Sequence, residues 1–364
     1  MQIRKIIQII EKNSSPRLQE SYDNTGLLTG NPDQESSEAL LCVDISEEVI
    51  NEAIKLKINF IISHHPFIFG GIKKVNGKNE TERILIKAIK NDIAIYALHT
   101  SYDQTIPGIS YALAKHLGLT DIRILDPRPD NLKKLVSFVP LKSAEKVREA
   151  ILTAGAGHIG NYDFCSFQTE GTGTFRALDG SHPYVGKKGN IHHEPELRIE
   201  TIVPEFLLKN VIEALLQAHP YEEVAYDIYP LENLNKQIGF GAIGKLSKET
   251  KEIEFLTFVK EKLQCKSIRH SKLLNKKISK VAVCGGSGIF LLQKAIAQKA
   301  DVFITADIKY HQFQEPDNKI VIVDIGHYES EKIFLPSLKE YLNKNLTNFA
   351  VRISKMNTNP VNYL

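Results

Sequence analysis

The sequence is poor in cysteine, and the four that it has, Cys42, Cys165, Cys265 and Cys284, are scattered without any CxxC spacing. Cysteines scattered in this way give no basis for a disulfide framework or a cysteine metal site. We expect reduced thiols and therefore a cytoplasmic protein. Cys42 and Cys284 stand in or beside apolar runs, which predicts that both are small buried hydrophobic residues.

Long apolar runs are also missing. A helix that spans a membrane needs roughly 18 or more consecutive apolar residues, and no segment approaches that length. The first 15 residues, MQIRKIIQIIEKNSS, mix apolar and charged side chains at helical spacing and lack the apolar core of a secretory signal. We expect a soluble chain that begins with an ordinary helix near residues 2–12.

An excess of charge of one sign is the third absence. The net charge of +3 comes from 46 basic and 43 acidic residues, and the two signs are mixed along the chain. A nucleic-acid or anionic-membrane partner would normally require a concentrated basic face, so neither partner is expected. The apolar share of 42% and the charged share of 24% are typical of a folded protein. A length of 364 residues favours two domains.

Strand-like and helix-like segments alternate in the first and last thirds of the chain. This alternation predicts βαβ units and a single, largely parallel sheet that both thirds share. The predicted strands cover residues 39–43, 60–62, 93–98, 280–284, 302–305 and 320–324. The predicted helices between and after the last three strands cover residues 289–299 and 331–343.

The middle of the chain follows a different order. After the proline-rich stretch DPRPDN at 126–131, the pattern predicts βαβ followed by βαβ, which is the ferredoxin-like order. Two short strands are expected at 164–168 and 173–176, and a long mobile loop at 171–189. Insertions are tolerated at exposed polar loops. We therefore predict three segments, an outer domain at 1–131 and 232–364 and an inserted domain at 132–231.

The segment SHHPFIFGG at 63–71 carries two adjacent histidines, His64 and His65, directly after the apolar run 59–62. In open α/β sheets, ligands bind at the carboxyl ends of the strands. The two imidazoles could therefore reach two different metal ions. The alternative is that both histidines simply end a loop beside Pro66.

Two more strand ends carry side chains of the same kind. LHTSYD at 98–103 supplies His99 and Asp103, although an aspartate in this position is also common in turns. GHYESE at 326–331 places His327 and Glu331 four residues apart, so they share one helical face and can point at one metal. A surface ion pair would have the same spacing.

Together these strand ends supply three imidazoles and two carboxylates, which is a ligand mixture suited to Zn, Mn or Fe. One catalytic zinc usually has three protein ligands and a water, so five side chains exceed its needs. A pair of divalent metal cations about 3.5 to 4 Å apart fits the number of ligands better. The predicted metal ligands are His64, His65, Asp103, His327 and Glu331.

A glycine-rich turn is a weaker candidate. VAVCGGSG at 281–288 predicts a strand, a tight turn and a helix start, so the amides near Gly286 and Gly288 could bind a phosphate. The segment lacks the complete spacing of a dinucleotide or P-loop motif. An ordinary strand-to-helix turn is the alternative.

Three further segments have both a functional and a structural interpretation. Asp307, Lys309 and His311 follow the predicted strand 302–305 and could orient ligands or transfer protons. YDNTGLL at 22–28 could line a pocket, or form a turn. HPYEE at 219–223 has a ligand-like spacing, but the end of a helix, capped by His219 and Pro220, explains it more simply.

In this order, SHHPFIFGG, LHTSYD, GGSG, ITADIKYHQ and GHYESE resemble the GTP cyclohydrolase I type 2 family, also called the Nif-three-like dinuclear metal-centre proteins. AGAGHIGNYDFCSF at 154–167 and AHPYEEVAYD at 218–227 resemble the PII-like insert of the longer bacterial members. The resemblance implies a discontinuous Nif-three-like α/β outer domain with an inserted α+β ferredoxin-like (PII-like) domain. It also implies a homohexamer.

The resemblance further implies how the ligands are divided. His65 and Asp103 would bind one ion, His64 and His327 the other, and Glu331 both. The phrase HTSYD departs from the family's HTNLD-like phrase at Ser101 and Tyr102, next to the ligands.

The implied activity is hydrolytic opening of the GTP imidazole ring with release of formate. In that hypothesis the ions activate water, His99 or His311 transfers protons, and the nucleotide triphosphate lies at Gly286, Gly288 or Lys309. Two alternatives keep the ions. One is a metal-dependent hydrolase of another phosphorylated or amide metabolite, and the other is a non-catalytic hexameric scaffold with a regulatory or sensing role.

Overall fold

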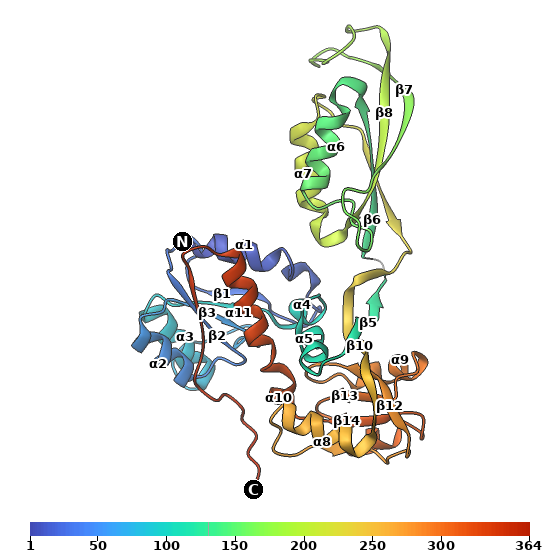
Figure 1. Cartoon of the computed structure of the whole chain (residues 1–364). Coiled ribbons are helices and arrows are strands. Elements are labelled where there is room, and N and C mark those ends of the chain that lie inside the picture. The colour runs from blue at the N-terminus through green and yellow to red at the C-terminus, as the bar shows by residue number, and fades with distance from the viewer. Residues whose placement is uncertain (130) are drawn as a thin grey trace. The chain divides into compact units, whose positions relative to one another are not determined.

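The structure, a computed structural model, describes residues 1–129 and 131–364 (Figure 1). Part of the proline-rich stretch at 126–131 therefore lies outside the described residues. The chain divides into two compact units. We call Met1–Asp126 with Ile238–Leu364 the outer unit, and Pro127–Gln237 the insert unit. Among the described residues, no helix is long and apolar enough to cross a membrane.

The outer unit contains a five-stranded sheet in the order β1-β4-β3-β2-β15. Only the pair β1 and β4 is antiparallel. The central strands consist of apolar residues that are buried on both faces, which is typical of parallel strands covered by helices. The strands are β1 (Gly26–Thr29), β2 (Glu38–Cys42), β3 (Phe60–Ser63), β4 (Ala94–Ala97) and β15 (Ala350–Ile353).

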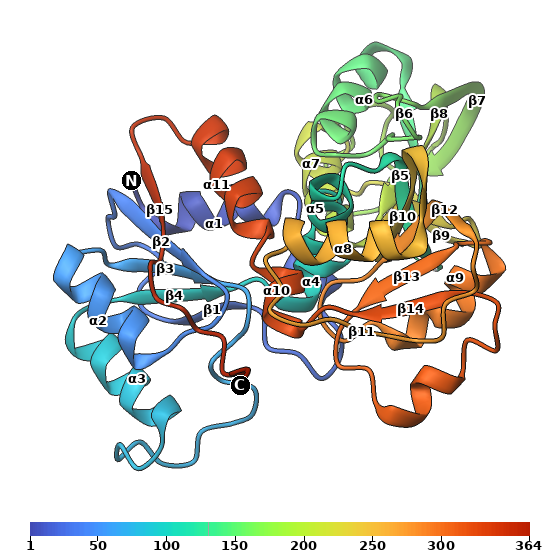
Figure 2. The same ribbon diagram turned by 60° about the horizontal axis from the view of Figure 1, so that its bottom comes forward.

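Helices cover both faces of this sheet (Figure 2). One face packs on α1 (Ile3–Glu11) and α11 (Phe334–Asn345), and the other on α2 (Glu47–Leu56) and α3 (Glu80–Lys90). Helix α1 buries Ile3, Ile6, Ile7 and Ile10, an apolar stripe at helical spacing. The predicted helix at 2–12 is thereby confirmed.

A six-stranded sheet in the order β11-β14-β13-β12-β10-β5 forms the rest of the outer unit. Its middle strands β12, β13 and β14 are parallel. Helices α5 (Ile109–His116) and α8 (Glu252–Lys262) pack on one face and α9 (Leu292–Ala297) on the other. The strands are β5 (Thr120–Arg128), β10 (Asn235–Lys251), β11 (Arg269–His270), β12 (Lys277–Val283), β13 (Val302–Thr305) and β14 (Val321–Asp324).

The prediction of one shared sheet was therefore wrong, because the first and last thirds of the chain form two sheets. Apolar runs identify strands, but they do not specify which strands pair. The predicted helix at 331–343 begins later, at Phe334, as α11, and Glu331 instead ends a separate short helix, α10 (His327–Glu331). Pro336 lies in the first turn of α11, where proline is tolerated, whereas in one continuous helix its ring would clash with the carbonyl of Lys332. The predicted helix at 289–299 is a 3₁₀ turn, Ile289–Leu291, followed by α9.

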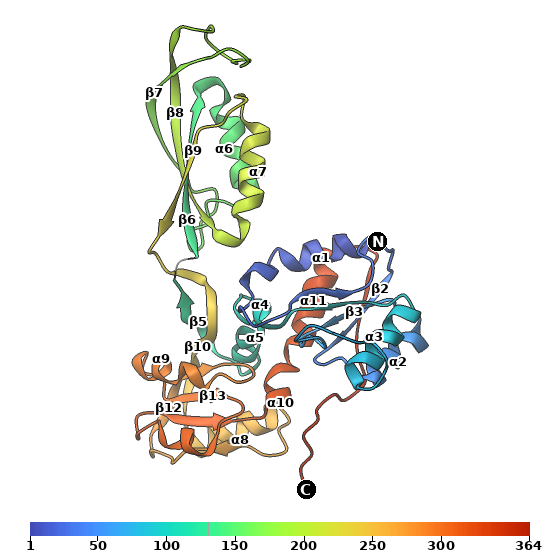
Figure 3. The same ribbon diagram turned by 180° about the vertical axis from the view of Figure 1, so that it is seen from behind.

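The insert unit has an antiparallel sheet in the order β7-β8-β6-β9, with α6 (Ala144–Thr153) and α7 (Leu208–Ala218) on one face (Figure 3). The order of its elements, βαββαβ, is the predicted one. His219 ends α7, as the structural interpretation of HPYEE expected. The strands are β6 (Leu132–Pro140), β7 (Phe167–Arg176), β8 (Ile191–Pro204) and β9 (Tyr226–Leu231).

Strand β7 corrects the prediction of two short strands and a loop that begins at residue 171. It is one strand that pairs with β8 from Phe167 to Arg176. Gly171 and Gly173 lower the strand propensity of this segment, which explains the error. The two glycines are part of the sheet.

All four cysteines are free, and Cys42 and Cys284 are buried as predicted.

Candidate metal centre

His64 and His65 directly follow strand β3 of the five-stranded sheet. Their backbone amides both donate to the carbonyl of Val43, over 3.1 and 2.9 Å, so the end of β2 fixes the direction of the chain. The side chain of His64 is completely buried, while His65 is partly exposed. Adjacent residues are thus held side by side at the carboxyl end of the strand, where ligands were expected.

Asp103 lies at the end of the short helix α4 (His99–Asp103), which follows β4. The amide of His99 donates to the carbonyl of His64 over 2.9 Å, so α4 starts beside the two histidines. The carboxylate of Asp103 lies 3.8 Å from Nε2 of His64. Ser101 and Tyr102, where the family phrase differs, point into the protein and are buried.

His327 and Glu331 belong to α10, which follows β14 of the six-stranded sheet. Their spacing of four residues places Nε2 of His327 3.2 Å from Oε1 of Glu331. Glu331 is buried, with a side chain 4% exposed. The helical pair predicted from GHYESE is confirmed in its geometry.

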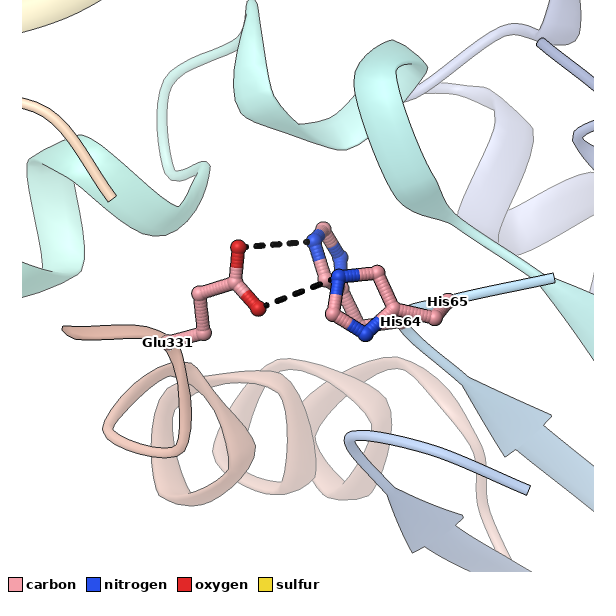
Figure 4. Close-up of side chains that lie close together, drawn as sticks. All are labelled: His64, His65 and Glu331. Carbon is pink, nitrogen blue, oxygen red and sulfur yellow. Dashed lines mark ion pairs between the residues drawn. The ribbon is translucent and has the colours of Figure 1, made fainter. Parts of the chain in front are cut away.

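Side chains from the two sheets meet at the carboxylate of Glu331 (Figure 4). Its Oε1 lies 3.5 Å from Nε2 of His64, and its Oε2 lies 3.3 Å from Nε2 of His65. Nε2 of His327 lies 3.4 Å from Nε2 of His65. The candidate ligands therefore lie where the carboxyl ends of two sheets face each other, and not along one sheet edge as predicted.

Two of these imidazoles contact a carboxylate through Nδ1, the ring nitrogen that does not face Glu331. Nδ1 of His65 lies 2.7 Å from Asp44, and Nδ1 of His327 lies 2.6 Å from Asp307. Histidines that bind metals usually donate Nδ1–H to such a group, which fixes the ring and leaves Nε2 as the ligand atom. The role suggested for Asp307, that of orienting a ligand, agrees with this contact.

His99 is built in the same way. Its Nδ1 lies 2.6 Å from Asp23, whose carboxylate is completely buried and also accepts from the amide and hydroxyl of Thr100. The ring of His99 lies 5.5 and 5.4 Å from the rings of His64 and His65, measured between centroids. Asp23, from the segment YDNTGLL, thus supports a third imidazole beside the centre.

Buried atoms without partners test whether a cation fits. Neither ring nitrogen of His64 has a hydrogen-bond partner within the described part of the chain, and neither has Oε2 of Glu331. Buried polar atoms are almost always satisfied, because an unpaired one costs about 1 to 3 kcal/mol. A divalent cation would satisfy an unpaired lone pair on each of the two residues. The residues present therefore fit a metal site.

The pKa values of these residues refer to the cluster without a metal ion, in which only protons can balance the charges. Burial lowers the pKa of His64 to about 4, so this imidazole is neutral at pH 7. Burial acts in the same direction on His327, but Asp307 and Glu331 outweigh it and raise the pKa to about 11. Burial and the charge of Glu331 raise the pKa of Asp103 well above its usual range. Protons on His327 and Asp103 thus balance the charges that a metal cation would otherwise balance.

Lys309 and His311 lie apart from this cluster. Both are exposed, in and beside the 3₁₀ turn Tyr310–Gln314. The ring of His311 packs against Tyr310, with 5.1 Å between the centroids. None of the contacts found in the described residues joins either side chain to the candidate ligands.

The glycine-rich turn does lie at the centre. A Cβ added to Gly286 would come within 2.6 Å of Oε1 of Glu331, so only glycine leaves this space. The amides of Gly286 and Gly288, however, donate to the hydroxyls of Ser330 and Thr305, over 2.8 Å each. A phosphate would have to displace these bonds. Binding of substrate at Gly286 and Gly288 stays a prediction.

The sequence reasoning missed Asp44 and the C-terminal segment. Asp44 follows β2, so the rule that identified His64 and Asp103 at strand ends could also have identified it. The hydroxyl of Thr358 donates to Asp44 over 2.8 Å. This contact joins residues 314 positions apart, and no local pattern predicts it.

The chain is similar over its whole length to known proteins. A model of the Duf34/NIF3 (NGG1p interacting factor 3) family matches residues 1–360. A Halalkalibacterium halodurans protein named GTP cyclohydrolase 1 type 2 homolog is 40% identical, covering 99% of this chain and 98% of the relative. A Bacillus subtilis protein of the same name is 38% identical, with the same two coverages.

A solved structure agrees with these similarities. The crystal structure of a Bacillus cereus protein related to NIF3 has a TM-score of 0.86 and 39% identity, and the match covers 100% of this chain and 99% of that one. The family predicted from the ordered motifs is confirmed. The chain belongs to the Duf34/NIF3 family.

Proposed function

We propose that the outer unit binds two divalent metal cations and acts as a metal-dependent hydrolase. The observation that supports it best is the approach of three imidazole Nε2 atoms to one buried carboxylate that has an unsatisfied oxygen. The ligands we propose are His64, His65, Asp103, His327 and Glu331.

The two oxygens of Glu331 suggest how the ligands divide. Oε1 faces His64 and His327, and Oε2 faces His65. This supports one ion at His64 and His327, a second at His65, and Glu331 on both. Asp103 completes the second group in the division that the resemblance implies, although its nearest imidazole in this structure is that of His64.

Bound ions would supply Lewis acidity and would lower the pKa of water, which is the chemistry that a hydrolase needs. The protein's own part is proton transfer, for which His99 is the best candidate. Asp23 fixes its ring, and the ring lies beside His64 and His65 with 15% of its side chain exposed. His311 has no such support, so we assign the role to His99.

The substrate that we propose is GTP, whose imidazole ring would be opened by water with release of formate. The name of the two curated relatives supports this choice. Lys309, exposed on the 3₁₀ turn after β13, and the turn at Gly286 and Gly288 are the proposed triphosphate contacts.

The test is formate release from GTP by protein loaded with Zn, Mn or Fe. We expect formate with wild type, and a loss of about 100-fold or more in kcat for His99→Gln at unchanged metal content, which is the usual scale for a general acid–base. Asp23→Asn should lower kcat less, because it only positions His99. Metal-loaded wild type that releases no formate from GTP contradicts the choice of substrate. An active His99→Gln variant contradicts the role of His99.

The assembly and the insert are further parts of the proposal. We propose a cytoplasmic homohexamer in which residues 132–231 form an inserted PII-like domain, as the resemblance implies. Light scattering after size-exclusion chromatography measures the mass directly. A mass that corresponds to six chains supports the proposal, and a monomer contradicts it.

A further inference from the structure

We propose that the insert unit contains a second binding site, separate from the metal centre, for a small organic cation with an apolar body. The site is a cavity of about 750 Å³. It lies within the insert unit, between the β7–β8 hairpin and two connecting segments near residues 177–184 and 221–225. Its volume falls in the range of about 300 to 1,000 Å³ that is usual for small-molecule sites.

The floor of the cavity is the sheet face that α6 and α7 leave uncovered. Leu197 and Ile199 of β8 pack against those helices, so their neighbours Glu196 and Arg198 point to the opposite face. On β7, the residues paired with these two are Gly171 and Thr169, which therefore share that face. The cavity thus has a sheet face for its base.

Two glycines create the space. A Cβ added to Gly171 meets no atom within 4 Å, so the missing side chain leaves the cavity open at this point. A Cβ added to Gly173 would collide with the carboxylate of Glu196. Gly171 does not have a positive φ, so a larger residue is compatible with its backbone. The same two glycines explain why the sequence predicts a loop from residue 171 and not one continuous strand.

Aromatic and aliphatic side chains form the walls. The ring of Tyr221 lies 6.1 Å from that of Phe175 and 6.2 Å from that of Tyr184, measured between centroids. The amide of His182 donates to Glu222 over 2.8 Å and joins the two connecting segments. Further apolar lining comes from Phe138, Ala177, Leu178, Pro183 and Ala225.

A nearly buried carboxylate supplies the polar end. Glu196 is 7% exposed, and its Oε1 accepts the hydroxyl of Tyr221 over 2.8 Å. Its other oxygen lies over Gly173. A carboxylate removed from water is costly unless it is hydrogen-bonded or paired with a cation. One phenol contact leaves an oxygen that can accept from a ligand.

The charges around the cavity favour a cation. On the cavity face of the sheet, Glu196 is acidic, and Arg198 is already paired with Glu200 over 2.9 Å. Glu222 and Glu223 of the connecting segment add two further carboxylates. An anionic ligand would meet repulsion, whereas an ammonium or guanidinium group could pair with Glu196 and lie against aromatic rings, which attract cations. The lining residues Glu170 and Arg176 pair with Leu197 and Ile191, so their side chains lie on the other face of the sheet.

The experiment is isothermal titration of the full chain with a panel of arylalkyl amines and guanidines, beginning with 2-phenylethylamine. Each compound is matched to its acid and its alcohol, such as 3-phenylpropionate and 2-phenylethanol. We expect at least one cation to bind at least about tenfold more tightly than its matched acid, which corresponds to about 1.4 kcal/mol.

Two variants locate the binding. Glu196→Gln keeps the shape and removes the charge, and should weaken the binding of the cation about tenfold or more. Gly171→Leu fills the cavity and should abolish binding, and circular dichroism verifies that both variants are folded. Glu145→Gln, on the exposed face of α6, is the matched control and should bind as wild type does.

The proposal is overturned if no cation of the panel binds, or if the acids bind as tightly as the cations. It is also overturned if Glu196→Gln and Gly171→Leu, both folded, bind as wild type does. Because all these measurements concern the insert unit, their outcome is independent of whether GTP is a substrate of the outer unit.

Discussion

Each unit of this protein contains a buried glutamate in a proposed binding site, and the two glutamates have different neighbours. Glu331 in the outer unit is approached by the Nε2 atoms of three histidines. Glu196 in the insert unit is approached by one phenol and lies among aromatic rings and glycines. Imidazole lone pairs favour a metal ion, whereas aromatic faces favour an organic cation. The neighbours of a buried carboxylate, more than the carboxylate itself, thus decide which cation fits.

Destabilising the insert unit has the largest consequence and tests whether the two sites are independent. Leu215 is completely buried between α7 and the insert sheet, so Leu215→Ala should destabilise the insert unit by about 2 to 5 kcal/mol. Thermal and denaturant unfolding measure this loss. Leu216, on the same helix and 46% exposed, is the matched control, for which Leu216→Ala should change stability by less than about 0.5 kcal/mol.

If the comparison is correct, Leu215→Ala weakens the binding of organic cations but leaves the metal content of the outer unit unchanged. A loss of metal from this variant would mean that the two sites depend on each other.

The next effect concerns the carboxylates behind the imidazoles. Asp44→Asn and Asp307→Asn each remove the charge that holds a histidine, and each should lower metal affinity about 10- to 100-fold. Competition with a chelating dye measures the affinity. Asp317→Asn, at an exposed position, should have no effect. If Asp44→Asn and Asp307→Asn bind metal as tightly as Asp317→Asn and wild type do, these carboxylates do not support the ligands.

Metal affinity should also depend on pH. The pKa of His327 is raised to about 11 in the cation-free cluster, so this group is protonated at neutral pH and must lose its proton when a metal binds. Each proton released makes the affinity fall about tenfold per unit decrease in pH. Titrations in buffers of different ionisation enthalpy count the released protons. A value of zero at pH 7 contradicts this picture of His327.

The smallest effect expected is that of the C-terminal segment. Thr358→Val removes the hydroxyl that donates to Asp44 and should weaken metal binding by at most about fivefold, the equivalent of roughly 1 kcal/mol for one hydrogen bond. Thr257→Val, which removes an exposed hydroxyl on α8, serves as the control. A loss as large as that of Asp44→Asn would show that the segment does more than orient Asp44.

The two sites also differ in what the sequence could predict. His64, His65, Asp103, His327 and Glu331 stand directly after apolar strands or at helical spacing, so local patterns were enough to select them. That they lie between two sheets could not be predicted, because strand pairing depends on contacts between distant residues. The contact from Thr358 to Asp44 is of the same long-range kind.

The cavity of the insert unit had no local signal of this type. Gly171 and Gly173 suggested a loop, since glycine is uncommon in strands. Only the pairing of β7 with β8 over its whole length, from Phe167 to Arg176, makes them strand residues that leave space on one face. The segment HPYEE predicts a helix end, and His219 does end α7. Nothing in this segment predicts that the hydroxyl of Tyr221 donates to Glu196.

We propose that Glu331 binds two metal ions, and the number of metal ions bound per chain tests this directly. Wild type and Glu331→Gln would be purified without added metal, saturated with Zn or Mn, freed of excess and analysed by elemental mass spectrometry. We predict two ions per chain in wild type and the loss of both in Glu331→Gln at an unchanged circular dichroism spectrum. Wild type with no tightly bound ion, or a Glu331→Gln variant that still binds two, would contradict the role of Glu331 as a ligand shared by two ions.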